Sequence, residues 1–487
     1  MIGITSYGAY IPLHRLSRTE LFRAWSGQGM LGIQVPGEKA VAGYDEDSIT
    51  MAVEAVLDCI RGTDPKTVNG LFFASTTHPY AEKQSAAYIA AVADMSREMR
   101  AADFSGCLRA GTIALSSAVD AIKAGSMKKV VVAAADTRLG APSGLMEQSC
   151  GDGSAALMLG DEDVIASIEA SYTITDEFAG VWRAQTDTFV RSWEDRMTLD
   201  TGYSSLLYDA MSGLMKQCNL KPADFAKAVY YSPLDVRAHN KMAKDLGFDP
   251  SQVQDSMFMT LGNTGTALAM MMLVAALEEA KPGDRILFGN YASGADAFVL
   301  KVTDAIEKVR DRRGIKRHLE SKKMVNNYET YLRWRNIIPL EPAQRPELAP
   351  ASLSAIRRSR KEILCLYGVK CKKCSTPQYR APASAGGRTP SRICVICQAK
   401  DEFDDYKFAD KNAKIFSYTH DNLATTDDPP VTNTMLDFVG GGRGMFDLTD
   451  RNTEDIEVGM LVEMTFRKLF FDRGIHNYYW KARPIRV

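Results

Sequence analysis

The same helix–turn–strand pattern occurs twice in this sequence, and this duplication limits the folds that the chain can adopt. The first copy, AGTIALSSAVDAIKAGSMKKVVVAAAD, begins at Ala110, and the second, TGTALAMMMLVAALEEAKPGDRILFGN, begins at Thr264. Each copy opens with a small residue followed by Gly-Thr, and equivalent positions lie 154 residues apart. Chance similarity between two such units is the alternative, but the matching order and spacing favour a duplicated core.

The surrounding residues alternate between strand-like and helix-like segments. Short apolar runs suited to buried strands are LFFAS (71–75), VVVAAAD (130–136), AVYYS (228–232) and RILFGNYA (285–292). Helix-like segments such as ALSSAVDAIKAG (114–125) and ALAMMMLVAALEEA (267–280) separate them. This alternation predicts a layered α/β fold made of two halves, residues 1–165 and 166–302.

Charge, hydropathy and cysteine count exclude several classes of protein. The 487 residues include 59 Lys+Arg and 60 Asp+Glu, so no basic excess is available for nucleic acid binding. No apolar run approaches the ~20 residues that a membrane span needs, and the start MIGITSYGAYIPLHRL resembles a strand rather than a signal peptide. An odd count of nine cysteines argues against a disulfide framework. We expect a cytoplasmic protein with no nucleic acid or membrane partner.

Four of the nine cysteines form a metal-binding pattern. Cys371-x-x-Cys374 is followed by Cys394-x-x-Cys397, and two such knuckles supply four thiolates in the tetrahedral arrangement that Zn²⁺ prefers. Four protein ligands leave no open position for water or substrate, so the predicted role is structural. An iron site or a redox dithiol is the alternative.

The remaining C-terminal segments differ in composition from the duplicated core. Residues 303–363 are rich in Arg and Lys and contain prolines, which is typical of a charged helical arm and linker. Residues 364–402 hold the cysteine pattern. Residues 403–487 contain strand-like pieces separated by Gly, Pro and Asp, and predict a small all-β module.

Cys107 is the one remaining cysteine placed for chemistry. It lies in DFSGCLRAG, where Gly106 permits a tight turn before the first helix of the repeat. A thiolate at such a turn is stabilised by the N-terminal N–H groups of the helix, and could attack an acyl thioester. The alternative is a buried packing cysteine.

The second copy of the repeat carries Asn263 at the equivalent turn, LGNTGTALA. A side-chain amide there could meet the same reaction centre from the other half of the molecule. Helix capping by a short polar residue is the alternative.

These residues together resemble the thiolase superfamily, and most closely archaeal-type hydroxymethylglutaryl-CoA synthases. The resemblance covers nearly all of residues 1–340. It is carried by the Cys107 turn, the GNTG turn and the segments STTHPYAEK (75–83), AADTRLGAPSG (134–144), CGDGSAALMLG (150–160) and GDRILFGNYASGADAF (283–298). Residues 365–487 resemble the zinc-ribbon and OB-fold domain that accompanies such enzymes and helps to hold coenzyme A in related complexes.

The resemblance implies a five-layered αβαβα fold, an acyl-enzyme on Cys107, a coenzyme A thioester substrate and a homodimer. Asn263 matches the active-site asparagine of the family. Two other family positions differ: the catalytic glutamate aligns with Thr76, and the active-site histidine aligns with Tyr231 or Ser232. A threonine cannot replace a carboxylate base, so the resemblance implies a product other than hydroxymethylglutaryl-CoA. Tyr231 could donate a proton or hydrogen bond to an oxyanion, or simply pack at a strand end.

Three functions follow as hypotheses. The first is an acyl-CoA enzyme that makes or cleaves a carbon–carbon bond through acyl-Cys107, by Claisen-type condensation or thiolytic cleavage. The second is a β-hydroxyacyl-CoA aldolase that uses tyrosines such as Tyr231 and Tyr291 instead of cysteine. The third is a catalytically silent acyl-CoA-binding scaffold.

His78, in the His-Pro-Tyr segment, is either part of a structural turn or a base beside Cys107.

Overall fold

The computed structural model describes residues 1–25, 35–341, 353–380 and 392–486. Within these residues the chain divides into two compact units. The first unit comprises Met1–Gly43 and Asp47–Tyr331, and the second comprises Tyr44–Glu46 and Leu332–Val487. No helix in the described part of the chain combines the length and the apolar character needed to cross a membrane.

The first unit is built on one continuous sheet. Among the described residues it has nine strands in the order β11-β12-β13-β8-β1-β7-β6-β4-β5. In chain order these are β1 (Gly3–Tyr10), β4 (Gly70–Ala74), β5 (Arg100–Phe104), β6 (Val130–Asp136), β7 (Gly153–Gly160), β8 (Ala166–Thr175), β11 (Lys227–Tyr230), β12 (Arg285–Tyr291) and β13 (Gly294–Val302).

Strand pairing repeats between the two halves of this sheet. In the first half, β1 and β7, and β7 and β6, pair antiparallel, whereas β6 pairs parallel with β4. In the second half, β8 and β13, and β13 and β12, pair antiparallel, whereas β12 pairs parallel with β11. The duplication expected from the sequence is therefore present in the topology.

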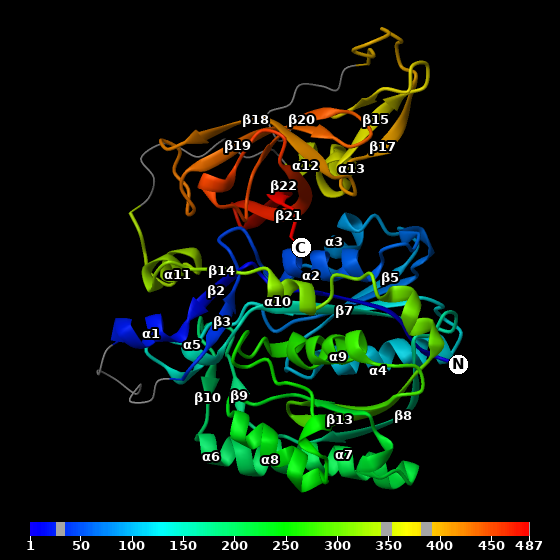
Figure 1. Ribbon diagram of the computed structural model, residues 1–487, viewed down its shortest axis with the longest axis vertical. Helices are drawn as coiled ribbons and strands as arrows, with labels where there is room; N and C mark the ends of the chain where they lie inside the picture. The colour runs from blue at the N-terminus through cyan, green and yellow to red at the C-terminus, as the bar shows by residue number, and fades with distance from the viewer. Residues whose placement is uncertain (26–34, 342–352, 381–391, 487) are drawn as a thin grey trace. The chain divides into compact units, whose positions relative to one another are not determined.

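Helices lie between and outside the two halves of the sheet, as Figure 1 shows. On one outer face are α2 (Ser48–Cys59) and α3 (Ser85–Val92), and on the other are α7 (Ser205–Cys218) and α8 (Val236–Leu246). Between the halves lie α4 (Ala110–Lys123) and α9 (Leu268–Glu279), which are the two repeated helices. Because α9 is enclosed by protein, it is apolar almost all round, with Met270, Met271 and Met272 fully buried. The layers follow the expected αβαβα order.

Smaller elements complete the first unit. A three-stranded sheet joins β14 (Lys323–Met324), β2 (His14–Ser17) and β3 (Glu38–Val41), and β9 (Val181–Trp182) pairs with β10 (Arg191–Ser192). The short helices are α1 (Arg18–Trp25), α5 (Leu145–Ser149), α6 (Asp195–Met197), α10 (Lys316–Glu320) and α11 (Tyr328–Trp334), the last of which runs into the second unit.

The first part of the Arg- and Lys-rich segment, up to Tyr331, belongs to the first unit. Arg310 donates to the carbonyl oxygens of Leu277, Glu278 and Ala280, at distances of 3.1, 2.8 and 2.6 Å. These carbonyls lie at the C-terminal end of α9, where no further helical turn supplies N–H donors. The guanidinium of Arg310 therefore supplies hydrogen-bond donors to the carbonyl groups at the end of this buried helix.

The second unit begins with α12 (Leu353–Arg358) and α13 (Arg360–Cys365) and contains two antiparallel sheets. The smaller sheet joins β16 (Pro377–Gln378), β15 (Tyr367–Cys371) and β17 (Phe403–Lys407). The larger sheet has, in the described residues, five strands: β18 (Ala413–Asp421), β19 (Val431–Phe438), β20 (Arg443–Asp447), β21 (Leu461–Asp472) and β22 (Ile475–Pro484). Its two outer strands, β20 and β22, are brought together by a bridge between Leu448 and Ala482, so the sheet closes on itself.

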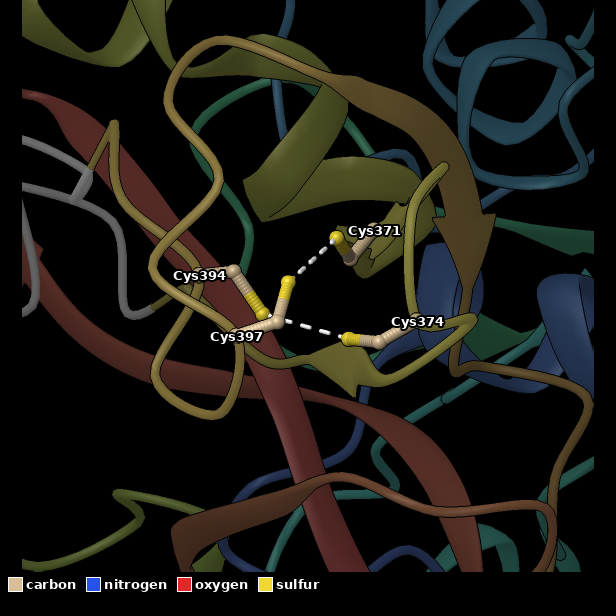
Figure 2. Close-up of side chains that lie close together, drawn as sticks. All are labelled: Cys371, Cys374, Cys394 and Cys397. Carbon is tan, nitrogen blue, oxygen red and sulfur yellow. Dashed lines mark hydrogen bonds between the residues drawn. The ribbon is translucent and has the colours of Figure 1, made fainter.

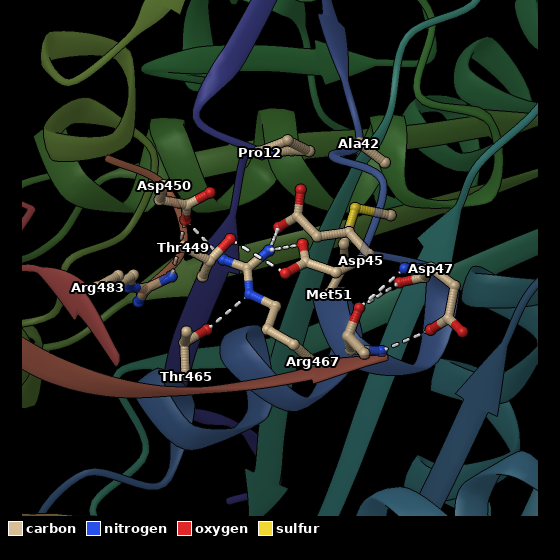
Figure 3. Close-up of polar contacts among 12 residues, drawn as sticks. Pro12, Ala42, Asp45, Asp47, Met51, Thr449, Asp450, Thr465, Arg467 and Arg483 are labelled. Carbon is tan, nitrogen blue, oxygen red and sulfur yellow. Dashed lines mark hydrogen bonds and ion pairs between the residues drawn. The ribbon is translucent and has the colours of Figure 1, made fainter. Parts of the chain in front are cut away.

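A buried group of charged side chains lies inside the second unit (Figure 3). The guanidinium of Arg467, only 1% exposed, lies 2.6 Å from Asp450 and 3.6 Å from Asp45, and it also pairs with Glu46. Lys481 binds Asp45 at 2.8 Å. Two of these acidic residues come from the N-terminal segment that belongs to this unit.

Candidate active site and metal centre

A cavity of about 510 Å³ opens in the first unit where several strands end. Its wall includes Thr76 just after β4, Cys107 just after β5, Arg138 just after β6 and Tyr231 just after β11. The carboxyl ends of the neighbouring parallel strands β4, β5 and β6 meet at one edge of the sheet, which brings Thr76, Cys107 and Arg138 together. Both halves of the duplicated core contribute to it.

Cys107 lies in the predicted turn between β5 and α4. Gly106 has φ of 93°, and a side chain there would meet no neighbouring atom, so the glycine is needed for its backbone conformation rather than for space. The carbonyl of Cys107 accepts a hydrogen bond from Ala110 N at 3.1 Å, which leads directly into the helix. The thiol is partly exposed and lines the cavity.

An ion pair fixes this turn to the second half of the core. Arg109, which follows Cys107 by two residues, binds Asp296 of β13 at 3.0 Å, and both side chains are buried. Its guanidinium also donates to the carbonyl oxygens of Ile174 and Ser293 at 3.1 and 3.3 Å. Breaking this ion pair would leave a buried charge without a partner, which is strongly destabilising. The pair therefore holds the turn that carries Cys107 in one position.

Asn263 holds Tyr231 in place. Its Nδ2 donates to the Tyr231 hydroxyl at 2.8 Å and to the Ser232 carbonyl at 3.1 Å, while its Oδ1 accepts from Gly265 N at 3.0 Å. Asn263 is fully buried and lies behind the cavity wall, whereas Tyr231 forms part of that wall. Of the two positions left open by the sequence, Tyr231 and not Ser232 lines the cavity.

The Tyr231 hydroxyl is set up as a hydrogen-bond donor. Because its oxygen accepts from Asn263, its proton is free to point to another acceptor. Burial raises the pKa of Tyr231 above its usual value, and nearby Arg138 and the Asn263 amide only partly oppose this effect. The phenol therefore stays neutral at physiological pH.

Asp136, at the end of β6, organises the wall that carries Thr76. Its Oδ1 accepts from Ser75 Oγ, Thr76 N and Thr77 Oγ1 at 2.9, 2.7 and 3.1 Å. Its Oδ2 accepts from Thr76 Oγ1 and Thr266 N at 3.0 and 2.8 Å. The hydroxyl of Thr76, the residue that aligns with the family glutamate, thus donates its hydrogen bond to the buried carboxylate of Asp136.

No acidic side chain lines the cavity among the described residues. His78 lies on the wall, but Nδ1 is 3.2 Å from Ser85 Oγ and Nε2 is 3.4 Å from the Phe104 carbonyl. Because a carbonyl only accepts, the contact at Nε2 requires that nitrogen to carry the proton. These contacts favour the structural alternative for His78 over a base beside Cys107.

Sequence reasoning did not identify Asp136 or Arg138 as site residues. Asp136 ends the apolar run VVVAAAD, and Arg138 follows it by two residues. Polar residues at the end of a buried strand were the sequence signal that could have identified them as site residues. Arg138 lines the cavity and donates to Asn263 Oδ1 at 3.4 Å.

The four cysteines of the second unit converge on one point (Figure 2). Their sulfur atoms all lie within 4.8 Å of one another, with 3.6 Å between Cys371 and Cys397 and 3.5 Å between Cys374 and Cys394. The two knuckles share a geometry: Ser375 N donates to Cys371 O and Gln398 N donates to Cys394 O, and both donor residues have positive φ. Four converging thiolates are a donor set that fits tetrahedral Zn²⁺.

Comparison with known proteins places the first unit in a family. No family model matches the chain. The hydroxymethylglutaryl-CoA synthase of Methanosarcina mazei is 33% identical over 349 residues, which are 70% of this chain and 99% of that protein. That of Methanocaldococcus jannaschii is 32% identical over 351 residues, covering 70% of this chain and 100% of its own length.

Solved structures agree on the fold. An HMG-CoA synthase complexed with CoA superposes with a TM-score of 0.60 at 18% identity, over 72% of this chain and 94% of that one. A 3-oxoacyl-[acyl-carrier-protein] synthase III from Aquifex aeolicus gives 0.53 at 20% identity, over 62% and 100%. The chain therefore belongs to the hydroxymethylglutaryl-CoA synthase family of thiolase-like, acyl-CoA-condensing acyltransferases.

Proposed function

We propose that Cys107 accepts an acyl group from an acyl-CoA and that the cavity then uses this thioester in a carbon–carbon bond-forming or bond-cleaving step. In the first step the thiolate attacks the thioester carbonyl, the bond from the acyl carbon to Cys107 sulfur forms, the bond to the coenzyme A sulfur breaks, and coenzyme A leaves as its thiolate. The observation that carries the proposal is the placement of Cys107 and Tyr231 on one cavity wall, from opposite halves of the duplicated core.

Tyr231 supplies the hydrogen bond that acyl transfer needs. Negative charge develops on the carbonyl oxygen as the thiolate attacks, and a neutral phenol in a buried wall stabilises it. Asn263 acts through Tyr231, because both hydrogens of its amide are directed to the Tyr231 hydroxyl and the Ser232 carbonyl. We therefore assign Asn263 as a positioning residue and Tyr231 as the donor to the oxyanion.

The substrate pair differs, in this proposal, from that of the hydroxymethylglutaryl-CoA synthases. Their reaction removes a proton from an acetyl group, which needs a base near the acyl-cysteine. In this cavity the family glutamate is Thr76, and its hydroxyl is bound to Asp136 at 3.0 Å. Acyl transfer to and from Cys107 needs no carboxylate base, so that part of the chemistry is retained.

A tyrosine-based cleavage of a β-hydroxyacyl-CoA is the second candidate. Tyr291 lines the same cavity, and its ring centroid lies 6.2 Å from that of Tyr231. Burial raises the pKa of Tyr291 as well. Such a reaction would proceed without an acyl-cysteine, so loss of Cys107 separates the two candidates.

In the second unit we propose a structural Zn²⁺ held by Cys371, Cys374, Cys394 and Cys397, and an OB-fold for the closed sheet of β18 to β22. Four thiolates hold two chain segments together and leave no position for substrate. The family likeness further supports a homodimer as the working form.

Intact-mass analysis after incubation with a panel of acyl-CoAs tests the main proposal. We expect an increment equal to the acyl group on the wild-type protein and on Cys218→Ala, which removes another partly exposed thiol of the first unit. We expect none on Cys107→Ala. Turnover that persists in Cys107→Ala would contradict the proposal and favour the tyrosine-based reaction, whereas binding without turnover in the wild type would indicate a scaffold.

A further inference from the structure

Arg138 is a buried cation on the wall of the active-site cavity. Arg138 follows the end of β6 by two residues and is 6% exposed. It lines the same cavity as Cys107 and Tyr231. Since the residue is more than nine-tenths buried, bulk water does little to solvate its charge.

No acidic side chain within the described residues forms an ion pair with Arg138. Its one hydrogen bond to those residues runs from Nη1 to Asn263 Oδ1, at the long distance of 3.4 Å. The Asp136 carboxylate and the Arg138 side chain both border Gly265, but the two oxygens of Asp136 accept five hydrogen bonds from Ser75, Thr76, Thr77 and Thr266 and form no ion pair with Arg138. Arg109, by contrast, has Asp296 at 3.0 Å.

A buried guanidinium facing a cavity without an acidic partner indicates that the ligand brings the negative charge. The phosphates of coenzyme A are separated from the thioester by the whole pantetheine arm, so they do not reach the wall beside the reaction centre. The oxyanion of acyl transfer has Tyr231 as its donor. The remaining source is the acyl group itself.

We propose that the acyl group carries a carboxylate and that Arg138 binds it, so that the substrate is the coenzyme A thioester of a short dicarboxylic acid. This proposal rests on the acyl-CoA function proposed above. The remaining N–H groups of the guanidinium form a planar fork that suits a bidentate carboxylate.

Acylation rates with matched substrates test this inference. Succinyl-CoA and glutaryl-CoA are compared with butyryl-CoA and valeryl-CoA, which have the same chain lengths without the carboxylate. We expect the wild type to prefer the dicarboxylic thioesters and Arg138→Met to lose that preference, with a selective decrease on the order of 10- to 100-fold. Arg138→Lys should fall between them, because it keeps the charge but not the fork.

The ratio between the two substrate classes distinguishes a substrate-binding role from a structural one. Arg138→Met also removes the contact to Asn263, but that loss should slow both classes equally. Arg237→Met, which changes an exposed arginine on α8, should leave the ratio unchanged. Equal rates for both classes in the wild type, or an equal decrease for both in Arg138→Met, would refute the inference.

Binding to Cys107→Ala separates this inference from the proposed function. Calorimetric titration of that variant with succinyl-CoA and butyryl-CoA needs no acyl transfer. We expect tighter binding of succinyl-CoA and loss of the difference when Arg138→Met is added; equal affinities would overturn the inference. Failure of wild-type Cys107 to become acylated by any thioester, with the difference in affinity intact, would count against the proposed reaction only.

Discussion

Replacing Asp136 by asparagine tests how the active-site wall is held together. The substitution keeps the shape of the side chain but turns one of its two acceptors into an NH₂ donor. If the NH₂ takes the position of Oδ2, the Thr76 hydroxyl can rotate to accept, but Thr266 N–H cannot. If it takes the position of Oδ1, the hydroxyls of Ser75 and Thr77 can rotate, but Thr76 N–H cannot.

Either orientation therefore leaves one buried backbone N–H facing another donor. An unsatisfied buried donor costs about 1–3 kcal/mol, and the remaining hydrogen bonds lose an ionised acceptor. Relief from burying a charge offsets part of this loss. We expect Asp136→Asn to lower the free energy of unfolding of the first unit by roughly 2–4 kcal/mol.

Hydrogen exchange and thermal unfolding provide the assay. The amides of Thr76 and Thr266 should exchange faster in Asp136→Asn, and the melting transition of the first unit should fall by about 3 to 6 °C. Acylation of Cys107 should slow as well, because Thr76 lies on the cavity wall. The matched control is Asp249→Asn, where an exposed aspartate accepts from Ser251 N and Oγ at 2.9 and 2.6 Å. A variant of Asp136 that melts and exchanges like the wild type would refute the reasoning.

Two further predictions concern other parts of the chain. Burial raises the pKa of Glu278 to about 7, so the folded state holds its proton more tightly than the unfolded state does. The protonated Glu278 contributes its full stabilisation below about pH 4.5, and about 3 kcal/mol of the free energy of unfolding is lost as the pH rises through 7. Melting temperatures measured from about pH 5 to 8 should therefore fall more steeply for the wild type than for Glu278→Gln. Parallel profiles for the two proteins would contradict this prediction. Cys371→Ser should reduce the zinc content measured by elemental analysis and destabilise the second unit, whereas Cys365→Ala should retain one zinc per chain. Stoichiometric zinc in Cys371→Ser would show that the ligand set is wrong.

Sequence patterns predicted the scaffold of the site better than its polar contacts. The apolar runs predicted β4, β6, β11 and β12, and the repeat predicted the two central helices and the turns that carry Cys107 and Asn263, because hydrophobic period and turn residues are local properties. Whether the oxygens of Asp136 are occupied, and whether Arg138 has an acidic partner, depends on groups 60 to 130 residues away. Such pairings arise only when the sheet is assembled.

The charged segment after the core illustrates the same limit. Its composition is typical of a solvated linker, and nothing in it indicates that Arg310 meets the end of α9. The acceptors are backbone carbonyl groups, which every residue has, so the residue types at these positions do not predict this contact.

The buried charges of the second unit have a consequence for the order in which the chain folds. Asp45 meets Thr449 across 404 residues and Lys481 across 436 residues of sequence. Contacts of such separation are slow to form, and a ribosome releases the first partner long before the last. Asp45 is therefore synthesised long before Arg467 and Lys481, and the second unit can complete its buried charge cluster only after Lys481 has been translated.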